Sequence, residues 1–119
     1  VALRFVAKYV FAIPLWQAKQ FNLAQRLIGH SGEHTRNLWL ASKCKARVRG
    51  MGSKYVEQRT GKEAKIPLQI NLSAESHEDL ALGMRLLGSL LEELAEQFAQ
   101  YCRTAKICPP RRFYFCTSP

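Results

Sequence analysis

Two short segments of the chain alternate between apolar and polar residues, which is the pattern of a strand with one buried face. In residues 44–49, small apolar residues alternate with three basic ones, so we expect a half-buried strand with a basic outer face. In residues 66–72, Ile or Leu stands at every second position, and Pro67 predicts an edge strand because proline cannot donate a hydrogen bond to the ladder. Residues 8–13 form an apolar run rich in β-forming residues and closed by Pro14, which predicts a third strand.

Residues 76–102 show the periodicity of an amphipathic helix. We expect Ser76 to cap this helix, with Asp79 at the capping-box position. Seven apolar residues follow at alternating steps of four and three, so they share one face of the helix; they are Leu80, Met84, Leu87, Leu91, Leu94, Phe98 and Tyr101. This stripe predicts packing on the sheet, and the alternative is the seam of a coiled-coil dimer. The helix is longer than a three-stranded sheet can cover, so its last turns are expected to contact the C-terminal segment or a second copy.

Two shorter helices are expected on either side of a glycine-containing turn. Residues 15–20 read as a connection, and Asn22 is expected to cap a short helix, with Gln25 as its capping-box partner. That helix should end at Gly29, and a second helix should begin just after Gly32.

The order of these elements predicts an α+β domain of two layers. Three strands are too few to stand alone, so the helices should cover one face of the sheet. The polar, glycine-containing residues 50–65 predict a mobile loop. We expect an N-terminal extension over residues 1–7, a folded domain over residues 8–102 and a C-terminal tail over residues 103–119, whose aromatic residues would be unusual if solvated.

The charge of the chain favours a polyanionic partner. Its formal net charge is +9, from 18 Lys and Arg against 9 Asp and Glu. Residues 43–65 hold eight basic and two acidic residues, while residues 75–96 hold six acidic residues and one Arg. This asymmetry predicts binding on one face, with nucleic acid as the first candidate and an anionic membrane surface as the second. No apolar run is long enough to span a bilayer, and the N-terminal residues lack a signal-peptide pattern.

The cysteines and histidines do not form a recognisable site. The four cysteines, Cys44, Cys102, Cys108 and Cys116, show no CxxC pair and no nearby CxxH pattern, so no metal site is expected. Free thiols predict a reducing, intracellular compartment, nuclear and/or cytoplasmic. The three histidines have no Ser, Cys or carboxylate at a spacing that indicates catalysis. We therefore expect neither an enzyme nor a cofactor.

The turn at residues 29–32, Gly-His-Ser-Gly, is the strongest candidate for binding chemistry. Two glycines three residues apart allow a sharp turn and the close approach of another backbone. The second glycine opens a helix, whose free N–H groups attract phosphate. A GxxG sequence is weak evidence in isolation, because many turns between helices contain glycine.

The segments around this turn resemble a eukaryotic-type (type I) K-homology (KH) domain. The resemblance is carried by F-N-L-A-Q-R-L-I-G-H-S-G at 21–32, C-K-A-R-V-R-G-M-G-S at 44–53 and G-K-E-A-K-I-P-L-Q-I at 61–70. They are similar to the KH domains of the branchpoint-binding splicing factor and the STAR group, over roughly residues 8–102. The resemblance implies a βααββα order, a three-stranded antiparallel sheet with three helices on one face, and a grip on about four nucleotides of RNA.

The resemblance also implies which residues touch RNA. The glycine turn would hold the RNA backbone, Leu27, Ile28 and Thr35 would line one wall of an apolar groove, and Val48 would line the other. The full set expected at the interface is Asn22, Arg26, Leu27, Ile28, Gly29, His30, Ser31, Gly32, Thr35, Lys45, Arg47, Val48 and Arg49.

One departure from the family concerns charge. The turn carries His30 and Ser31 where many family members have Lys or Arg, so the positive charge is expected from Arg26, Lys45 and Arg49. The implied function is single-stranded RNA binding in pre-mRNA splicing or mRNA processing, and single-stranded DNA stays open as a ligand.

A second function stays open beside RNA binding. It is a KH-like protein-interaction or dimerisation module with weak or no nucleic-acid binding. The surface for a second copy or a protein partner would be the 76–102 helix and the tail.

Overall fold

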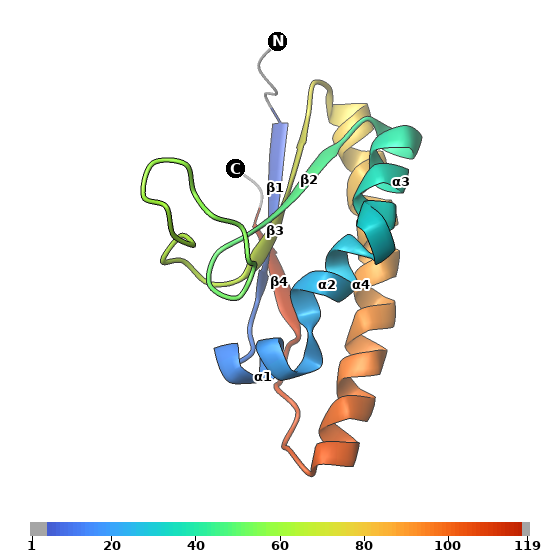
Figure 1. Cartoon of the computed structure of the whole chain (residues 1–119). Helices are drawn as coiled ribbons and strands as arrows, with labels where there is room; N and C mark the ends of the chain where they lie inside the picture. Colours follow the sequence, from blue (N-terminus) through green and yellow to red (C-terminus); the bar gives the residue numbers. More distant parts are fainter. Residues whose placement is uncertain (1–4, 118–119) are drawn as a thin grey trace.

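The computed structural model describes residues 5–117 and consists of a sheet with helices on one side (Figure 1). The strands form one antiparallel sheet in the order β2-β3-β1-β4. Their bounds are Phe5–Phe11 for β1, Lys45–Arg49 for β2, Gln69–Ala74 for β3 and Tyr114–Thr117 for β4. The helices are α1 (Leu15–Phe21), α2 (Leu23–Ile28), the 3₁₀ turn η1 (His30–Gly32), α3 (Glu33–Ser42) and α4 (His77–Ala105).

The sheet has a fourth strand that the sequence did not predict. It comes from the segment expected to be a tail, and Tyr114 pairs with Phe11 of β1. The edge position predicted for the strand at residues 66–72 is also wrong, because β3 lies between β2 and β1. Pro67 precedes β3, so its missing N–H does not interrupt the ladder. β1 begins at Phe5, inside the expected extension, whose residues 1–4 lie outside the described part of the chain.

The first helix was also missed, since residues 15–20 were expected to be a connection. Helix α1 buries Gln17, Ala18 and Phe21. Asn22 then adopts the left-handed conformation, at φ 63°, and its side chain caps neither α1 nor α2. The predicted capping box at this position is therefore wrong, because a left-handed residue between two helices lacks the extended backbone of an N-cap.

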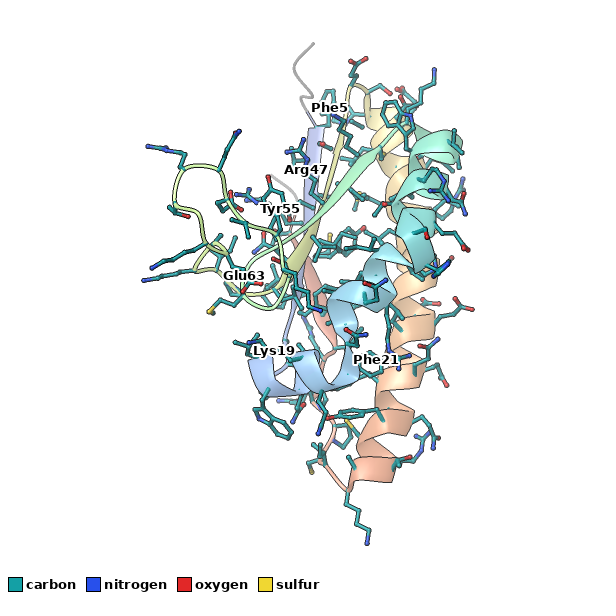
Figure 2. The ribbon with its side chains drawn as sticks, in the orientation of Figure 1. Phe5, Lys19, Phe21, Arg47, Tyr55 and Glu63 are labelled. Atoms are coloured by element: carbon teal, nitrogen blue, oxygen red, sulfur yellow. The ribbon has the colours of Figure 1, made fainter. Side chains whose placement is uncertain are left out.

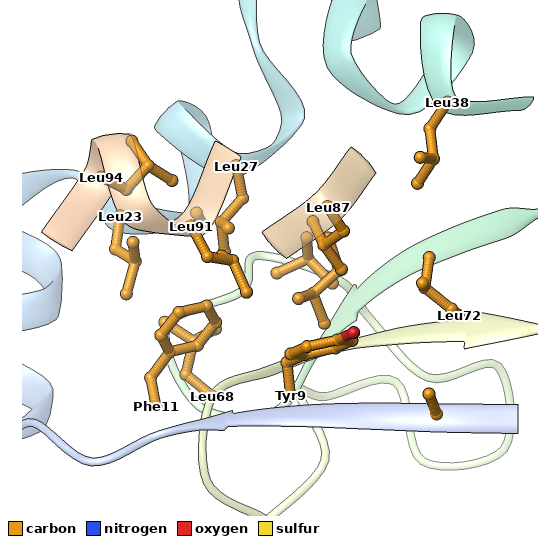
Figure 3. Close-up of a cluster of buried hydrophobic side chains, with 14 of the residues drawn as sticks. Tyr9, Phe11, Leu23, Leu27, Leu38, Leu68, Leu72, Leu87, Leu91 and Leu94 are labelled. Carbon is orange, nitrogen blue, oxygen red and sulfur yellow. The ribbon is translucent and has the colours of Figure 1, made fainter. Parts of the chain in front are cut away.

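Helix α4 follows the prediction closely. The Ser76 hydroxyl accepts the backbone N–H of Asp79 at 3.1 Å, which confirms the N-cap. The apolar stripe packs on the sheet, where Leu87, Leu91 and Leu94 meet Tyr9 and other strand residues (Figure 3). The packing on the sheet is confirmed. The last turns contact the C-terminal segment, with the Phe98 and Phe113 ring centroids 5.2 Å apart.

Gly83 sets how closely α4 approaches the start of β2. A Cβ atom at this position would lie 2.4 Å from Sγ of Cys44, the residue before β2, and 3.3 Å from Oγ of Ser42. The Cys44 thiol in turn contacts the Asp79 carbonyl oxygen at 3.1 Å. Glycine therefore lets α4 lie directly against the start of β2.

The outer face of the sheet is basic, and part of α4 is acidic. Lys45 and Arg47 are exposed on the sheet face that points away from the helices, while Glu92, Glu93 and Glu96 are exposed on α4. This arrangement agrees with the asymmetry predicted from the sequence. No helix within residues 5–117 is long and apolar enough to cross a membrane.

Candidate nucleic-acid interface

The turn between α2 and α3 depends on its first glycine. Gly29 has φ 82° and ψ 172°, a region that is essentially restricted to glycine. A Cβ atom there would lie 2.8 Å from Cγ and 3.0 Å from the backbone N of His34. At Gly32, with φ 76°, the nearest atom to such a Cβ is Oγ1 of Thr35 at 3.9 Å. Gly29 is therefore required both by its backbone conformation and by close packing, whereas at Gly32 only the positive φ favours glycine.

The variable residues of the turn point into solvent. His30 and Ser31 are both exposed, and Ser31 lies in the left-handed region at φ 55°. The Arg36 guanidinium donates a hydrogen bond to the Ser31 carbonyl oxygen at 3.1 Å. A fixed positive charge thus lies beside the turn, at a residue that was not among the predicted contacts. The sequence feature that could have indicated Arg36 is its position as a basic residue in the first turns of the helix that begins after Gly32.

A groove of about 550 Å³ lies beside the turn, between α2, α3, β2 and the loop that follows β2. Four of the residues predicted for the interface line it: Ile28, Thr35, Arg47 and Val48. Ile28 and Thr35 of one expected wall and Val48 of the other line the same groove, whereas Leu27 does not. Six further lining residues were missed, and they are Ala24, Gln25, Ala46, Ser53, Lys54 and Tyr55.

The loop expected to be mobile is fastened by hydrogen bonds at the edge of the groove (Figure 2). The Glu63 carboxylate accepts the backbone N–H groups of Gly52 at 3.1 Å and Lys54 at 2.6 Å. These two hydrogen bonds lower the pKa of Glu63. Buried Ser53 donates to the Gly50 carbonyl oxygen at 2.6 Å and accepts the N–H of Tyr55 at 3.1 Å. The loop thereby holds the Tyr55 ring, 42% exposed, against the groove.

Three predicted contact residues point elsewhere. Leu27 is fully buried in the core, so it supports the groove without lining it. Arg26 donates to the Phe21 carbonyl oxygen at 2.8 Å and to Oε1 of Gln97 at 2.6 Å, and its guanidinium lies over the Phe21 ring. Its charge is therefore directed toward α4. Asn22 is exposed but does not line the groove.

The basic residues of β2 differ in what they can contribute. Arg49 forms a bidentate ion pair with Glu57, at 3.0 and 2.7 Å, which raises its pKa and neutralises its charge. Lys45 is exposed on the outer face of the sheet and does not line the groove. The positive charges at the groove itself are therefore Arg47 and Lys54.

Comparison with known protein families identifies the type of domain. A family model described as KHDC4/BBP-like, KH-domain type I, matches residues 17–92. The matched segment includes the glycine turn, both walls of the groove and the loop that carries Tyr55. No curated protein matches the chain.

Proposed function

Since the chain belongs to the KHDC4/BBP-like type I KH domains, a family of RNA-binding and typically non-enzymatic modules, we propose that the groove beside the glycine turn binds single-stranded RNA. About four nucleotides would lie between the turn and β2. Their phosphates would face the turn, and their bases would enter the groove.

The observation that carries this proposal is the make-up of the groove. Ile28, Ala46 and Val48 give it an apolar lining suited to the faces of bases. β2 is an edge strand, so backbone groups along its free edge have no strand partner and can read the hydrogen-bonding edges of bases. Both features favour unpaired nucleotides, because a duplex hides the base faces and their Watson–Crick edges.

The charges around the groove suit a phosphate backbone. Arg36 lies beside the turn, and Arg47 and Lys54 line the groove. Two or three phosphate contacts to a single strand predict a slope of log affinity against log salt of about −1.4 to −2.1. Binding should therefore be modest and should weaken as salt is raised.

The test is a double substitution at the exposed positions of the turn, His30→Asp with Ser31→Asp. Both side chains point into solvent, and Asp tolerates the left-handed backbone of Ser31, so the fold should survive. Two negative charges beside the RNA phosphates should lower the affinity at least tenfold. The measurement is fluorescence anisotropy with a randomised pool of short labelled RNA, repeated with a matched DNA pool to compare the two nucleic acids.

A charge-matched control separates local from overall repulsion. Ser89→Asp with Gln100→Asp adds the same two charges at exposed positions of α4 and should change binding much less. Unfolding midpoints of both variants would establish that each is folded. Equal RNA binding by wild-type protein and the turn variant would exclude the groove as the site.

We also propose that the protein acts in pre-mRNA splicing or mRNA processing, in the nucleus and/or cytoplasm. Ultraviolet cross-linking in cells, followed by sequencing of the bound RNA, tests this role. Enrichment of intronic or other pre-mRNA sequence is the expected result, and its absence would remove the proposed role without affecting RNA binding.

The alternative function, protein interaction through α4 and the C-terminal segment, has less support. The apolar stripe of α4 is buried against the sheet, and the C-terminal segment pairs with β1, so neither is free to bind a partner in this way. The apolar surface that stays accessible includes Phe115 of the C-terminal segment. It also includes a hollow of about 250 Å³ between α3 and α4, where Leu38, Leu86 and Leu90 are among the lining residues.

A further inference from the structure

The helices leave one face of the sheet uncovered, and this face carries basic residues from two strands (Figure 1). In the strand register, Arg47 lies opposite Asn71, which in turn lies opposite Lys8. Lys45 lies opposite Ser73 in the neighbouring row. Lys8, Lys45 and Arg47 are all exposed, so the open face presents three cations beside neutral polar side chains.

A hollow of about 290 Å³ lies on this face, and Lys45, Arg47, Asn71 and Ser73 are among its lining residues. Within residues 5–117, the buried Oδ1 atom of Asn71 has no hydrogen-bond partner. The NH₂ group of Asn71 can donate a hydrogen bond to a phosphate oxygen, whereas its Oδ1 atom is an acceptor and cannot.

The hollow and the groove share one lining residue. Arg47 lines both of them, on either side of the edge strand β2. Arg49 also lines the hollow, but its charge is already paired with Glu57. A single-stranded RNA that leaves the groove over β2 would therefore pass from the basic groove to the basic open face of the sheet.

We propose that the open face of the sheet binds the phosphates of nucleotides that flank the four in the groove. Lys8, Lys45, Arg47 and Asn71 would form this extension, which rests on the proposed RNA-binding function and lengthens its site. The position of Arg47 in the lining of both the groove and the hollow favours RNA over an anionic membrane. The contacts go to phosphates, so the extension should add affinity without adding sequence preference.

The test compares two lengths of RNA with a variant that leaves the groove intact. Lys8→Gln with Lys45→Gln removes two charges from the open face, and neither residue lines the groove. Wild-type protein should bind randomised ten-nucleotide RNA more tightly than four-nucleotide RNA. The variant should lose about five- to tenfold of its affinity for the longer RNA, keep its affinity for the shorter one within about twofold, and show a salt slope shallower by about 1.4.

The matched control is Arg85→Gln with Arg103→Gln, which removes two exposed charges from α4. Equal losses in the control and in the open-face variant would overturn the extension and indicate a general effect of net charge. The same conclusion would follow if wild-type protein bound both lengths equally. Loss of binding to phosphatidylserine vesicles, with unchanged binding to long RNA, would overturn it in favour of a membrane surface.

The proposed function and its extension fail in different ways. If wild-type protein bound neither length at low salt, RNA binding itself would be excluded. If it bound four nucleotides through the turn and gained nothing from further ones, the groove would stand and the extension alone would be rejected.

Discussion

Gly83→Ala measures how much the close approach of α4 to β2 matters for stability. Alanine is favoured over glycine within a helix by about 1 kcal/mol, so the substitution would stabilise the protein if space allowed. The added Cβ would lie 2.4 Å from the Cys44 Sγ, about 1 Å inside ordinary contact distance. Overpacking of this kind costs about 1–3 kcal/mol. We therefore expect a net loss of about 0–2 kcal/mol in the free energy of unfolding.

Gly88→Ala is the matched control in the same helix. A Cβ atom at Gly88 meets no atom within 4 Å, so this variant should be more stable than wild-type protein by about 0.5–1 kcal/mol. The difference between the two variants isolates the packing term, at about 1–3 kcal/mol.

Urea unfolding followed by circular dichroism gives both free energies. The cost of Gly83→Ala should shrink in a Cys44→Ala background, since the clashing sulfur is absent there. Equal stability of Gly83→Ala and Gly88→Ala would refute the packing argument. Because Cys44 leads directly into β2, a displaced strand should also weaken RNA binding by Gly83→Ala, and Gly88→Ala should leave it unchanged.

Three further predictions concern the loop and the long helix. Tyr55→Leu should weaken RNA binding by about 1–3 kcal/mol if the ring stacks on a base, and Tyr55→Phe should restore it; equal affinities of wild-type protein and Tyr55→Leu in anisotropy titrations would contradict stacking. The lowered pKa of Glu63 means that its contribution to stability is present above the ordinary Glu value of about 4.3 and is lost as the pH falls through the lowered value. The NMR amide signals of Gly52 and Lys54 should titrate with that lowered midpoint and should not do so in Glu63→Gln. Ser76→Ala should lower the free energy of unfolding by about 1 kcal/mol, because it removes the N-cap of α4; an unchanged urea midpoint would argue against that cap.

Local patterns in the sequence were enough to predict several elements. The alternation at residues 44–49 predicted the strand β2 with its basic outer face. The helical periodicity after Ser76 predicted α4 with its N-cap and its buried apolar stripe. The two glycines three residues apart predicted where α2 ends and α3 begins. Each of these signals depends on neighbours within a few positions, so it can be read without knowing the rest of the fold.

Other features depend on residues far apart in the chain. Strand β4 forms because its residues pair with β1, about a hundred positions earlier. The four-residue stretch Tyr114–Thr117 is too short to predict this pairing. Helix α1 lacks a long apolar stripe, and it is defined by the burial of Phe21 against Phe98 and Tyr101.

The sequence by itself determined the family, the glycine turn and the basic character of β2, because motif spacing and strand alternation are local properties. Only the tertiary structure decided which of the predicted residues reach the groove. It directed Arg26 toward Gln97 and paired Arg49 with Glu57, and it brought Arg36 to the turn and Tyr55 to the groove. The physical reason is that the direction of a long side chain depends on whichever acceptors and apolar surfaces folding brings within its reach.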